Sequence, residues 1–267
     1  MRLAGEGVGE GYPLVLLHGL TATRRSVLHD SLHLPRQGFR LISYDARAHG
    51  ESDPAPQGAG YTYAELARDL GAVVEDQTAG EKPVLAGHSM GAHAIAAHAL
   101  ESADRLAALV LICPASLGTP LPDEVLEYWD GLADGLESGG VEGFVRAYEA
   151  PGLHPEWRDT LLRITRERLQ AHRHRADLAR ALREVPRSLP FDGLSELEFL
   201  DPPALVVASH DEADPGHPYA VAEEWARRLP NARLISEAEG DSPLAWQGGR
   251  LSREIAAFCA PYASGSD

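Results

Sequence analysis

The sequence predicts an α/β protein with a doubly wound, mostly parallel sheet into which a block of helices is inserted. Two observations predict the sheet. Short apolar runs alternate with helical patterns along the chain, and each run is continuous rather than alternating between apolar and polar residues. Continuous apolar strands are buried on both faces, as in a parallel sheet covered by helices. A third observation predicts the insertion, because this rhythm stops between residues 115 and 200 and then resumes.

Six apolar runs are the expected strands, and five segments between or after them are the expected helices. The strands are predicted at residues 13–19, 39–45, 83–89, 106–114, 203–209 and 232–237. The helices are predicted at residues 26–34, 63–77, 90–102, 218–229 and 247–258. Repeated alternation of this kind is typical of doubly wound domains.

The inserted segment contains helical patterns and no convincing strand. In "PEWRDTLLRITRERLQ", for example, Trp157 and Leu161 recur at helical spacing. Helices inserted between two strands of an open sheet can cover the carboxyl ends of the strands, where such sheets bind ligands. We therefore expect a core formed by residues 1–114 and 201–267, and a helical cap formed by residues 115–200.

Composition and charge exclude several classes of partner. The chain has 24 lysine and arginine residues against 40 aspartate and glutamate residues, a formal charge of −16. This charge repels phosphate groups, so neither nucleic acid nor an anionic membrane is expected as a partner. The first residues lack the apolar stretch of a signal peptide and no run is long enough to span a membrane, so we expect a cytoplasmic protein. Cys113 and Cys259 lie far apart in sequence and are expected to be buried thiols.

The segment "VLAGHSMGAHA" carries the strongest chemical signal. Gly87, Ser89 and Gly91 form the pattern G-x-S-x-G between a predicted buried strand and a helix of small residues. The glycines permit a sharp turn that projects the serine Oγ from the end of the sheet. The helix start offers free N–H groups and a positive dipole end to an oxyanion. We therefore predict that Ser89 is a nucleophile or derives from one.

In this context the motif resembles the α/β-hydrolase fold family, and the resemblance covers nearly the whole chain. "LLHGL" is similar to the family's oxyanion loop, and "YDARAHGES" is similar to its D-x-R-G-H-G-x-S loop, with Ala48 in place of the first glycine. The resemblance implies that the N–H groups of Leu20 and Met90 hold the oxyanion. It also implies hydrolysis of a carboxylic ester or similar acyl bond in a small-molecule substrate, with no cofactor and no metal.

The family's triad follows the chain order serine, acid, histidine, and the acid belongs in the loop after the strand at 203–209. That loop offers Asp211, Glu212 and Asp214. Counting from the strand favours Glu212, whereas the spacing to Pro218 at the next helix favours Asp214. We select Asp214, because the proline, the helix and the following strand all fit that count.

The resemblance implies a catalytic histidine directly after Gly240, some seventeen residues before Phe258. Asp241 occupies that position, and no histidine follows residue 217. A serine hydroxyl needs a proton acceptor with a pKa near neutrality, and an ordinary aspartate has a pKa of about 4. The expected position of the base therefore holds a residue that is poorly suited to the task.

Three hypotheses follow from this departure. In the first, His217 is a relocated base and Asp241 is its orienting carboxylate. In the second, the chain is an active enzyme that uses another base or catalyses a different reaction, with the oxyanion hole and the cap retained. The other histidines near the expected site are His18, His49, His88 and His93, each of which also has a structural explanation. In the third, the chain is a binding protein or pseudoenzyme in which Ser89 holds a ligand without attacking it.

One further pair of histidines suggests a metal site. His172 and His174 lie two residues apart in a segment with a helical pattern. Residues two apart on a helix point to different faces, so they are unsuited to sharing a metal. We expect both side chains on the surface.

Overall fold

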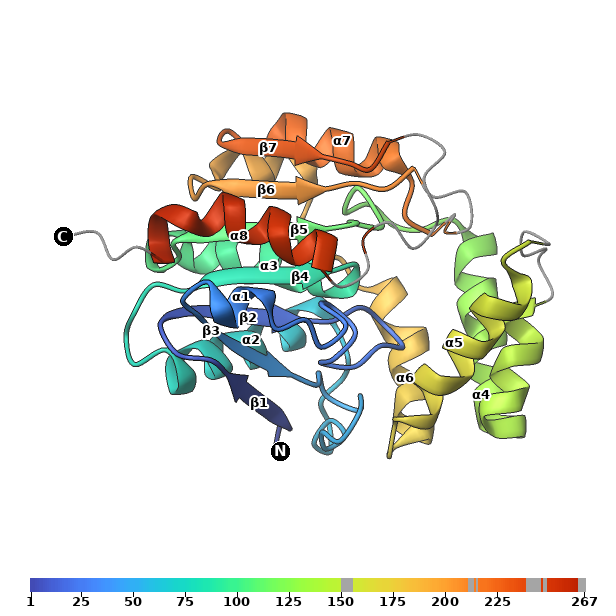
Figure 1. The fold of residues 1–267 in the computed structure, drawn as a ribbon. Helices are drawn as coiled ribbons and strands as arrows, with labels where there is room; N and C mark the ends of the chain where they lie inside the picture. The colour runs from blue at the N-terminus through green and yellow to red at the C-terminus, as the bar shows by residue number, and fades with distance from the viewer. Residues whose placement is uncertain (150–155, 211–213, 215, 239–245, 247–248, 264–267) are drawn as a thin grey trace.

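The computed structural model describes residues 1–149, 156–210, 214, 216–238, 246 and 249–263. In this part of the chain the strands are β1 (Gly5–Val8), β2 (Tyr12–Leu17), β3 (Phe39–Tyr44), β4 (Val84–His88), β5 (Ala108–Ile112), β6 (Ala204–Val207) and β7 (Ala232–Ile235). They form one sheet in the order β1-β3-β2-β4-β5-β6-β7, in which β1 is antiparallel to β3 and the other neighbours are parallel (Figure 1). The six predicted strands correspond to β2 through β7, and β1 is additional.

The helices are α1 (His33–Arg36), α2 (Tyr63–Gln77), α3 (Met90–Ser102), α4 (Asp123–Glu149), α5 (Arg158–Gln170), α6 (Arg175–Glu184), α7 (Tyr219–Arg228) and α8 (Gly249–Ala263). Short 3₁₀ turns lie at Ala103–Arg105, Val185–Arg187 and Leu194–Phe199. The predicted helix at 26–34 is wrong: His29 and Asp30 have φ of 48° and 56°, which a right-handed helix cannot accommodate. None of the helices in the described residues has the length and apolarity that crossing a membrane requires.

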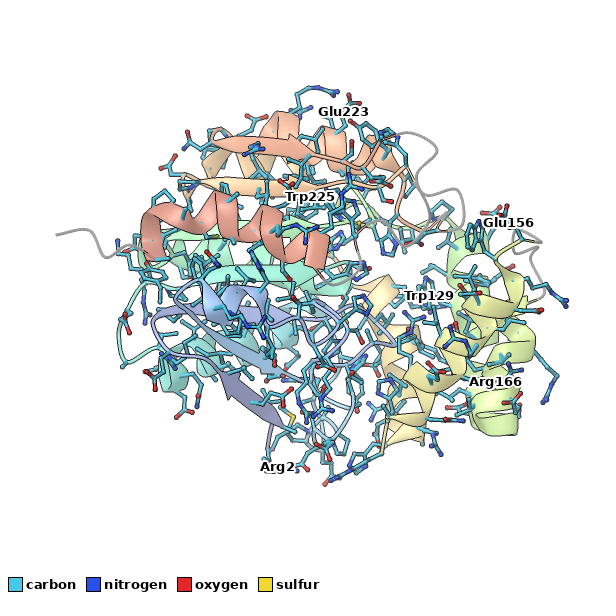
Figure 2. All side chains as sticks on the ribbon, viewed as in Figure 1. Arg2, Trp129, Glu156, Arg166, Glu223 and Trp225 are labelled. Carbon is cyan, nitrogen blue, oxygen red and sulfur yellow. The ribbon has the colours of Figure 1, made fainter. Side chains whose placement is uncertain are left out.

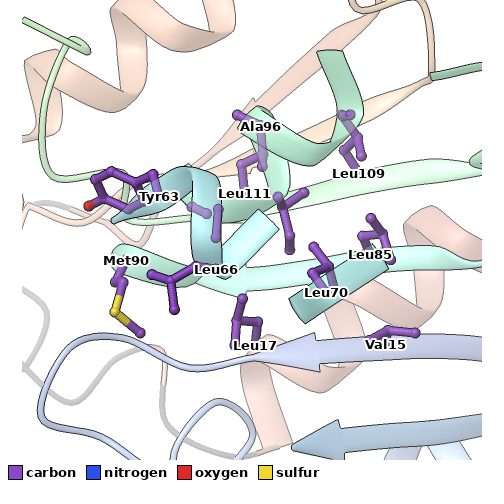
Figure 3. Packing of buried hydrophobic residues seen from close by; sticks show 14 of the residues in the cluster. Val15, Leu17, Tyr63, Leu66, Leu70, Leu85, Met90, Ala96, Leu109 and Leu111 are labelled. Carbon is purple, nitrogen blue, oxygen red and sulfur yellow. The ribbon is translucent and has the colours of Figure 1, made fainter. Parts of the chain in front are cut away.

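Helices cover both faces of the sheet, and this explains why the strands read as continuous apolar runs. Successive residues of a strand point to opposite faces. Accordingly Val15 and Leu17 of β2 pack with α2, α3 and α7, whereas Leu14 and Leu16 pack with α1 and α8. Figure 3 shows Leu17 and Leu66 of α2 in the first of these two clusters. Both faces are therefore hydrophobic core.

Between β5 and β6 the chain forms α4, α5 and α6, which lie beyond the carboxyl ends of the central strands (Figure 1). These helices have a hydrophobic cluster of their own, and Leu20 from the loop after β2 packs against it. The His172 imidazole bonds through Nε2 to the carbonyl oxygen of Thr21 at 2.9 Å, and the N–H of Arg173 donates to Gly50 at 3.0 Å. The helices are thus fastened to the loops that follow β2 and β3.

The loop after β3 is held by charged groups on both sides. The Arg47 guanidinium donates to the two carboxylate oxygens of Asp69 on α2 at 2.7 and 2.8 Å. Asp45 accepts a hydrogen bond from the backbone of Arg24 at 2.8 Å and forms an ion pair with its guanidinium. Ala48 has a φ of 63°, in the left-handed region that favours the glycine for which it substitutes. The loop keeps its conformation through these contacts despite the alanine.

Candidate active site

Ser89 lies in the tight turn between β4 and α3, at the carboxyl end of the sheet. Its φ of 52° and ψ of −114° are rarely adopted by a residue with a side chain. A Cβ on Gly87 would lie 2.5 Å from the Gly91 carbonyl group, and one on Gly91 would lie 2.2 Å from the oxygen of Leu17, so both positions require glycine. The Ser89 N–H donates to Ile112 of β5 at 2.9 Å. Packing on several sides therefore imposes the strained conformation of Ser89.

The loop after β2 touches this turn. A Cβ on Gly19 would lie 2.8 Å from Nδ1 of His88 and 3.3 Å from Cβ of Ser89. The N–H of Leu20, the next residue, has no acceptor among the described residues. Met90 is the first residue of α3, and the first N–H groups of a helix have no acceptor within it. Gly19 lies against Ser89, and the two predicted oxyanion donors are the residues that follow them, Leu20 and Met90.

His217 and Asp214 form a close pair in the turn before α7. His217 Nδ1 lies 2.7 Å from Oδ2 of Asp214, and the His217 N–H donates to the Asp214 carbonyl oxygen at 3.1 Å. The centre of the His217 ring is 5.1 Å from that of His88, which precedes Ser89. The structure thus brings the predicted acid and the relocated histidine together beside the nucleophile turn. Within the described contacts, Ser89 Oγ makes no hydrogen bond to His217.

The hydrogen bond between the side chains of His217 and Asp214 has a donor and an acceptor that follow from the charge of the carboxylate. Burial raises the pKa of Asp214, but the charge of His217 and its hydrogen bond outweigh burial and hold the pKa below its usual value. Asp214 is therefore an ionised acceptor, and His217 Nδ1 is the donor in their hydrogen bond. In a neutral imidazole only one nitrogen carries a proton, so Nε2 of His217 is left free to accept one.

His18 and His93 are both committed to structural hydrogen bonds. His18 is fully buried, its Nε2 accepts from the Ala46 N–H at 2.9 Å, and its Nδ1 donates to the Gly19 oxygen at 2.8 Å. His93 Nδ1 donates to the Ser89 carbonyl oxygen at 2.9 Å, and its Nε2 lies 3.1 Å from Oγ of Ser116. Neither ring has a nitrogen available for the proton of Ser89.

His88 and His49 are buried histidines with low pKa values. Burial and then the charge of His217 lower the pKa of His88 to about 3, and burial followed by the charges of His18 and His172 lowers the pKa of His49 well below its usual value. His49 Nδ1 bonds to the Arg47 carbonyl oxygen at 2.9 Å. Because a base is effective when its pKa is near the working pH, both are poor proton acceptors.

The expectation that His172 lies on the surface is wrong. The residue is 2% exposed, and its Nδ1 accepts a hydrogen bond from Gly50 at 2.8 Å while its Nε2 bonds to Thr21. The helical spacing argument does not apply, because α5 ends at Gln170 and α6 begins at Arg175. His172 instead lies in the connection between these helices and fastens them to the core.

Three of the predicted site residues are not described by the structure. They are Asp211, Glu212 and Asp241, so their positions are not compared with that of Asp214.

Glu237, which the sequence reasoning missed, is 3% exposed. Its carboxylate accepts hydrogen bonds from Ser209 Oγ at 2.5 Å, the His210 N–H at 2.7 Å and Trp246 Nε1 at 2.9 Å. Its sequence signal is weak, a polar residue two positions after β7.

Comparison with known proteins agrees with this architecture. A family model described as alpha/beta hydrolase fold matches residues 12–247. The AB hydrolase superfamily protein YisY of Bacillus subtilis is 29% identical over 149 residues, which are 54% of this chain and 51% of that protein. Epoxide hydrolase 3 of Siraitia grosvenorii is 35% identical over 103 residues, 39% of this chain and 32% of that protein. The chain thus spans about half or less of these two relatives.

A solved structure matches more completely. An esterase from Thermogutta terrifontis, in a malate-bound form, superposes with a TM-score of 0.79 at 25% sequence identity. The match covers 98% of this chain and 94% of that one. The whole arrangement of sheet and helices is therefore shared with that protein.

Proposed function

The chain belongs to the alpha/beta hydrolase fold family, a family of hydrolases, and we propose that it cleaves a carboxylic ester or related acyl bond of a small molecule with Ser89 as the nucleophile. The contact that carries this proposal is the Asp214–His217 pair beside the nucleophile turn. This pair provides a histidine from the same loop as the acid. The position at which the family has its catalytic histidine is occupied by Asp241 in this chain. The chain order serine, acid, histidine is kept.

Each residue then has a defined role. Ser89 Oγ attacks the carbonyl carbon while its proton passes to Nε2 of His217, and the carbonyl electron pair moves onto the oxygen. The N–H groups of Leu20 and Met90 hold that oxyanion. Asp214 keeps the Nδ1 proton of His217 in place and stabilises the imidazolium. The intermediate collapses, the alcohol leaves with the proton from His217, and water then hydrolyses the acyl-enzyme by the same steps.

This assignment modifies the first of the three sequence hypotheses. That hypothesis gave Asp241 the task of orienting His217, whereas Asp214 already accepts the hydrogen bond from Nδ1. The form of the second hypothesis in which another histidine is the base is disfavoured by the bound nitrogens of His18 and His93 and by the low pKa of His88. We further propose that α4, α5 and α6 act as a cap over the site.

A binding protein or pseudoenzyme is the second candidate function. Two observations favour it: Asp241 stands at the family's histidine position, and within the described residues Ser89 Oγ has no hydrogen bond to His217. Apo active sites often show long or poorly aligned catalytic hydrogen bonds, so the second observation weighs less than the first.

A fluorophosphonate probe separates the two functions. We expect covalent labelling of wild-type protein at Ser89, identified by mass spectrometry, none in Ser89→Ala, and much slower labelling in His217→Ala. Asp214→Asn and Asp241→Asn are compared to identify the carboxylate that orients His217. Absence of labelling at high probe concentration, in protein that melts cooperatively, would establish the binding function instead.

A further inference from the structure

Arg168, near the end of α5, is a partly buried cation that forms no hydrogen bond or ion pair within the described residues. Its Nε is shielded from solvent and forms no hydrogen bond. Within the described residues its guanidinium forms no ion pair, whereas two other arginines of the same helix do: Arg163 pairs with Glu167 and Arg166 with Glu142. Removing a charge from water without a compensating partner is unfavourable. The counter-charge for Arg168 is therefore to be sought outside the described chain.

Arg168 lies near the end of α5 that leads to the contact with the loop after β2. Thr165, three residues before Arg168 and therefore on the same face of the helix, is 2% exposed. His172, four residues after Arg168, reaches the carbonyl oxygen of Thr21, directly after the predicted oxyanion donor Leu20. In Figure 2, Trp129 and Arg166 mark the layer of helices to which α5 belongs. Arg168 thus lies near the end of α5 that His172 fastens to the loop after β2.

The guanidinium of Arg168 acts electrostatically on residues of the candidate site. Its charge contributes to lowering the pKa of Asp214 and of His88, and it opposes the effect of burial on the pKa of Tyr148. Burial lowers the pKa of Arg168 itself, and Tyr148 and Asp214 offset this only in part. Asp214 forms no ion pair with Arg168 within the described residues, and its Oδ2 lies 2.7 Å from Nδ1 of His217.

We propose that Arg168 binds a carboxylate carried by the substrate, so that the enzyme acts on esters that bear a free carboxylate at a short distance from the ester group. A guanidinium offers two parallel N–H donors that match the two oxygens of a carboxylate. A ligand of this kind supplies the counter-charge that the described chain lacks. In a protein with a formal charge of −16, an unpaired cation beside the site also offsets the general repulsion of anions. This inference rests on the proposed function.

The first test measures binding and does not depend on turnover. Ser89→Ala protein is titrated calorimetrically with monomethyl glutarate and with methyl pentanoate, two esters of equal chain length that differ in the terminal carboxylate. We expect the anionic ester to bind at least about 30-fold more tightly, since hydrogen bonds to charged groups are the strong ones. Adding Arg168→Gln should abolish the difference, whereas adding Arg163→Gln, at an exposed position of the same helix, should preserve it.

A conservative variant keeps the binding test decisive if Arg168→Gln does not fold. Arg168→Lys retains the charge without the two-pronged geometry, so its preference for the anionic ester should be intermediate. Equal affinity of the two esters, no binding of either, or an unchanged preference after Arg168 is replaced would overturn the inference.

The second test follows hydrolysis of the same two esters by proton release. We expect kcat/KM for monomethyl glutarate to fall at least about 30-fold in Arg168→Gln while kcat/KM for methyl pentanoate is kept. Turnover of both esters with no effect of Arg168 on their ratio would overturn the inference and leave the proposed function standing. Arg168-dependent binding without any turnover would support the carboxylate site and overturn the proposed function.

Discussion

The two halves of the candidate active site are held in different ways. The nucleophile half is fixed by contacts to several elements: Ser89 is bonded to Ile112 of the neighbouring strand, Gly91 packs against Leu17 of β2, and within α3 His93 bonds to the Ser89 carbonyl oxygen. The base half consists of Asp214 and His217, three residues apart in one loop, with side chains that are 45% and 16% exposed. One half is part of the core, and the other is a local contact at its edge.

This difference shows which half of such a site can change. Moving the nucleophile would require rebuilding the contacts of β4, α3 and the loop after β2, each of which is close-packed. Moving the base requires only that a histidine be placed within reach of a carboxylate in a partly exposed loop. A site in which the serine turn keeps its family geometry while the histidine has changed loop is the expected result.

The largest effect should come from removing the base. In His217→Ala the proton of Ser89 loses its acceptor, and we expect kcat/KM for an activated ester to fall at least about 10³-fold. The measurement is steady-state hydrolysis of p-nitrophenyl acetate, with background hydrolysis subtracted.

The matched control for this variant is His210→Ala. His210 belongs to the same loop, is exposed and stacks on Tyr219 with ring centres 4.0 Å apart, so its loss should leave turnover close to that of the wild type. If His217→Ala kept wild-type turnover, the base half would have to be sought among other residues.

The nucleophile half should instead respond through stability. In Gly91→Ala the new Cβ would lie 2.2 Å from the Leu17 oxygen, and because this is backbone that cannot move alone we expect a loss of about 3 kcal/mol in the free energy of unfolding. Urea denaturation measures this. Gly131→Ala in α4 is the control, since its Cβ would meet no atom within 4 Å and alanine favours a helix. Equal stability of both variants would contradict the rigid account of the nucleophile half.

The same contrast explains how far the sequence predicts the fold. The predicted helices at 63–77 and 90–102 match α2 and α3, because each begins at a clear local signal: Thr62, whose side chain accepts from Glu65, and the serine turn. The strand β1 is missed because "GEGV" has no apolar run. The helix expected at 26–34 is wrong because the left-handed backbone of two polar residues within it leaves no sequence pattern.

The two halves of the site also differ in how far the sequence predicts them. Ser89 is found from sequence because glycines that must fit a packed turn leave a readable motif. The contact of Asp214 with His217 could be anticipated from their shared loop, but not which carboxylate would accept the hydrogen bond. Arg168 leaves no pattern at all, because whether an arginine of this helix is partly buried and unpaired or exposed and paired one turn away, as Arg163 is with Glu167, depends on the packing around the helix. Burial of His172 depends likewise on the distant Thr21 and Gly50.

His172 provides a pH-dependent test at the junction between the nucleophile half and the helices above it. Burial lowers the pKa of His172 from 6.5 to about 4. Above pH 6.5 the ring is neutral in both folded and unfolded states, so its contribution is fully present. As the pH falls from 6.5 to 4 the unfolded state takes up the proton first, and stability should fall by up to about 3 kcal/mol. Urea denaturation at several pH values should show a shallower decline for His172→Gln than for the wild type, and identical slopes would contradict the assignment.

Asp214→Asn should give the smallest of these effects and the sharpest view of the base half. His217 remains as an acceptor, but the amide neither fixes its tautomer as reliably nor stabilises the imidazolium, so we expect kcat to fall about 10²-fold with little change in stability. The loss is smaller than for His217→Ala because a partly exposed pair can be partly replaced by water. Hydrolysis and urea denaturation of Asp214→Asn and Asp241→Asn are measured side by side. If only Asp241→Asn lost activity, the close Asp214–His217 contact would be structural, and the base half would depend on two loops rather than one.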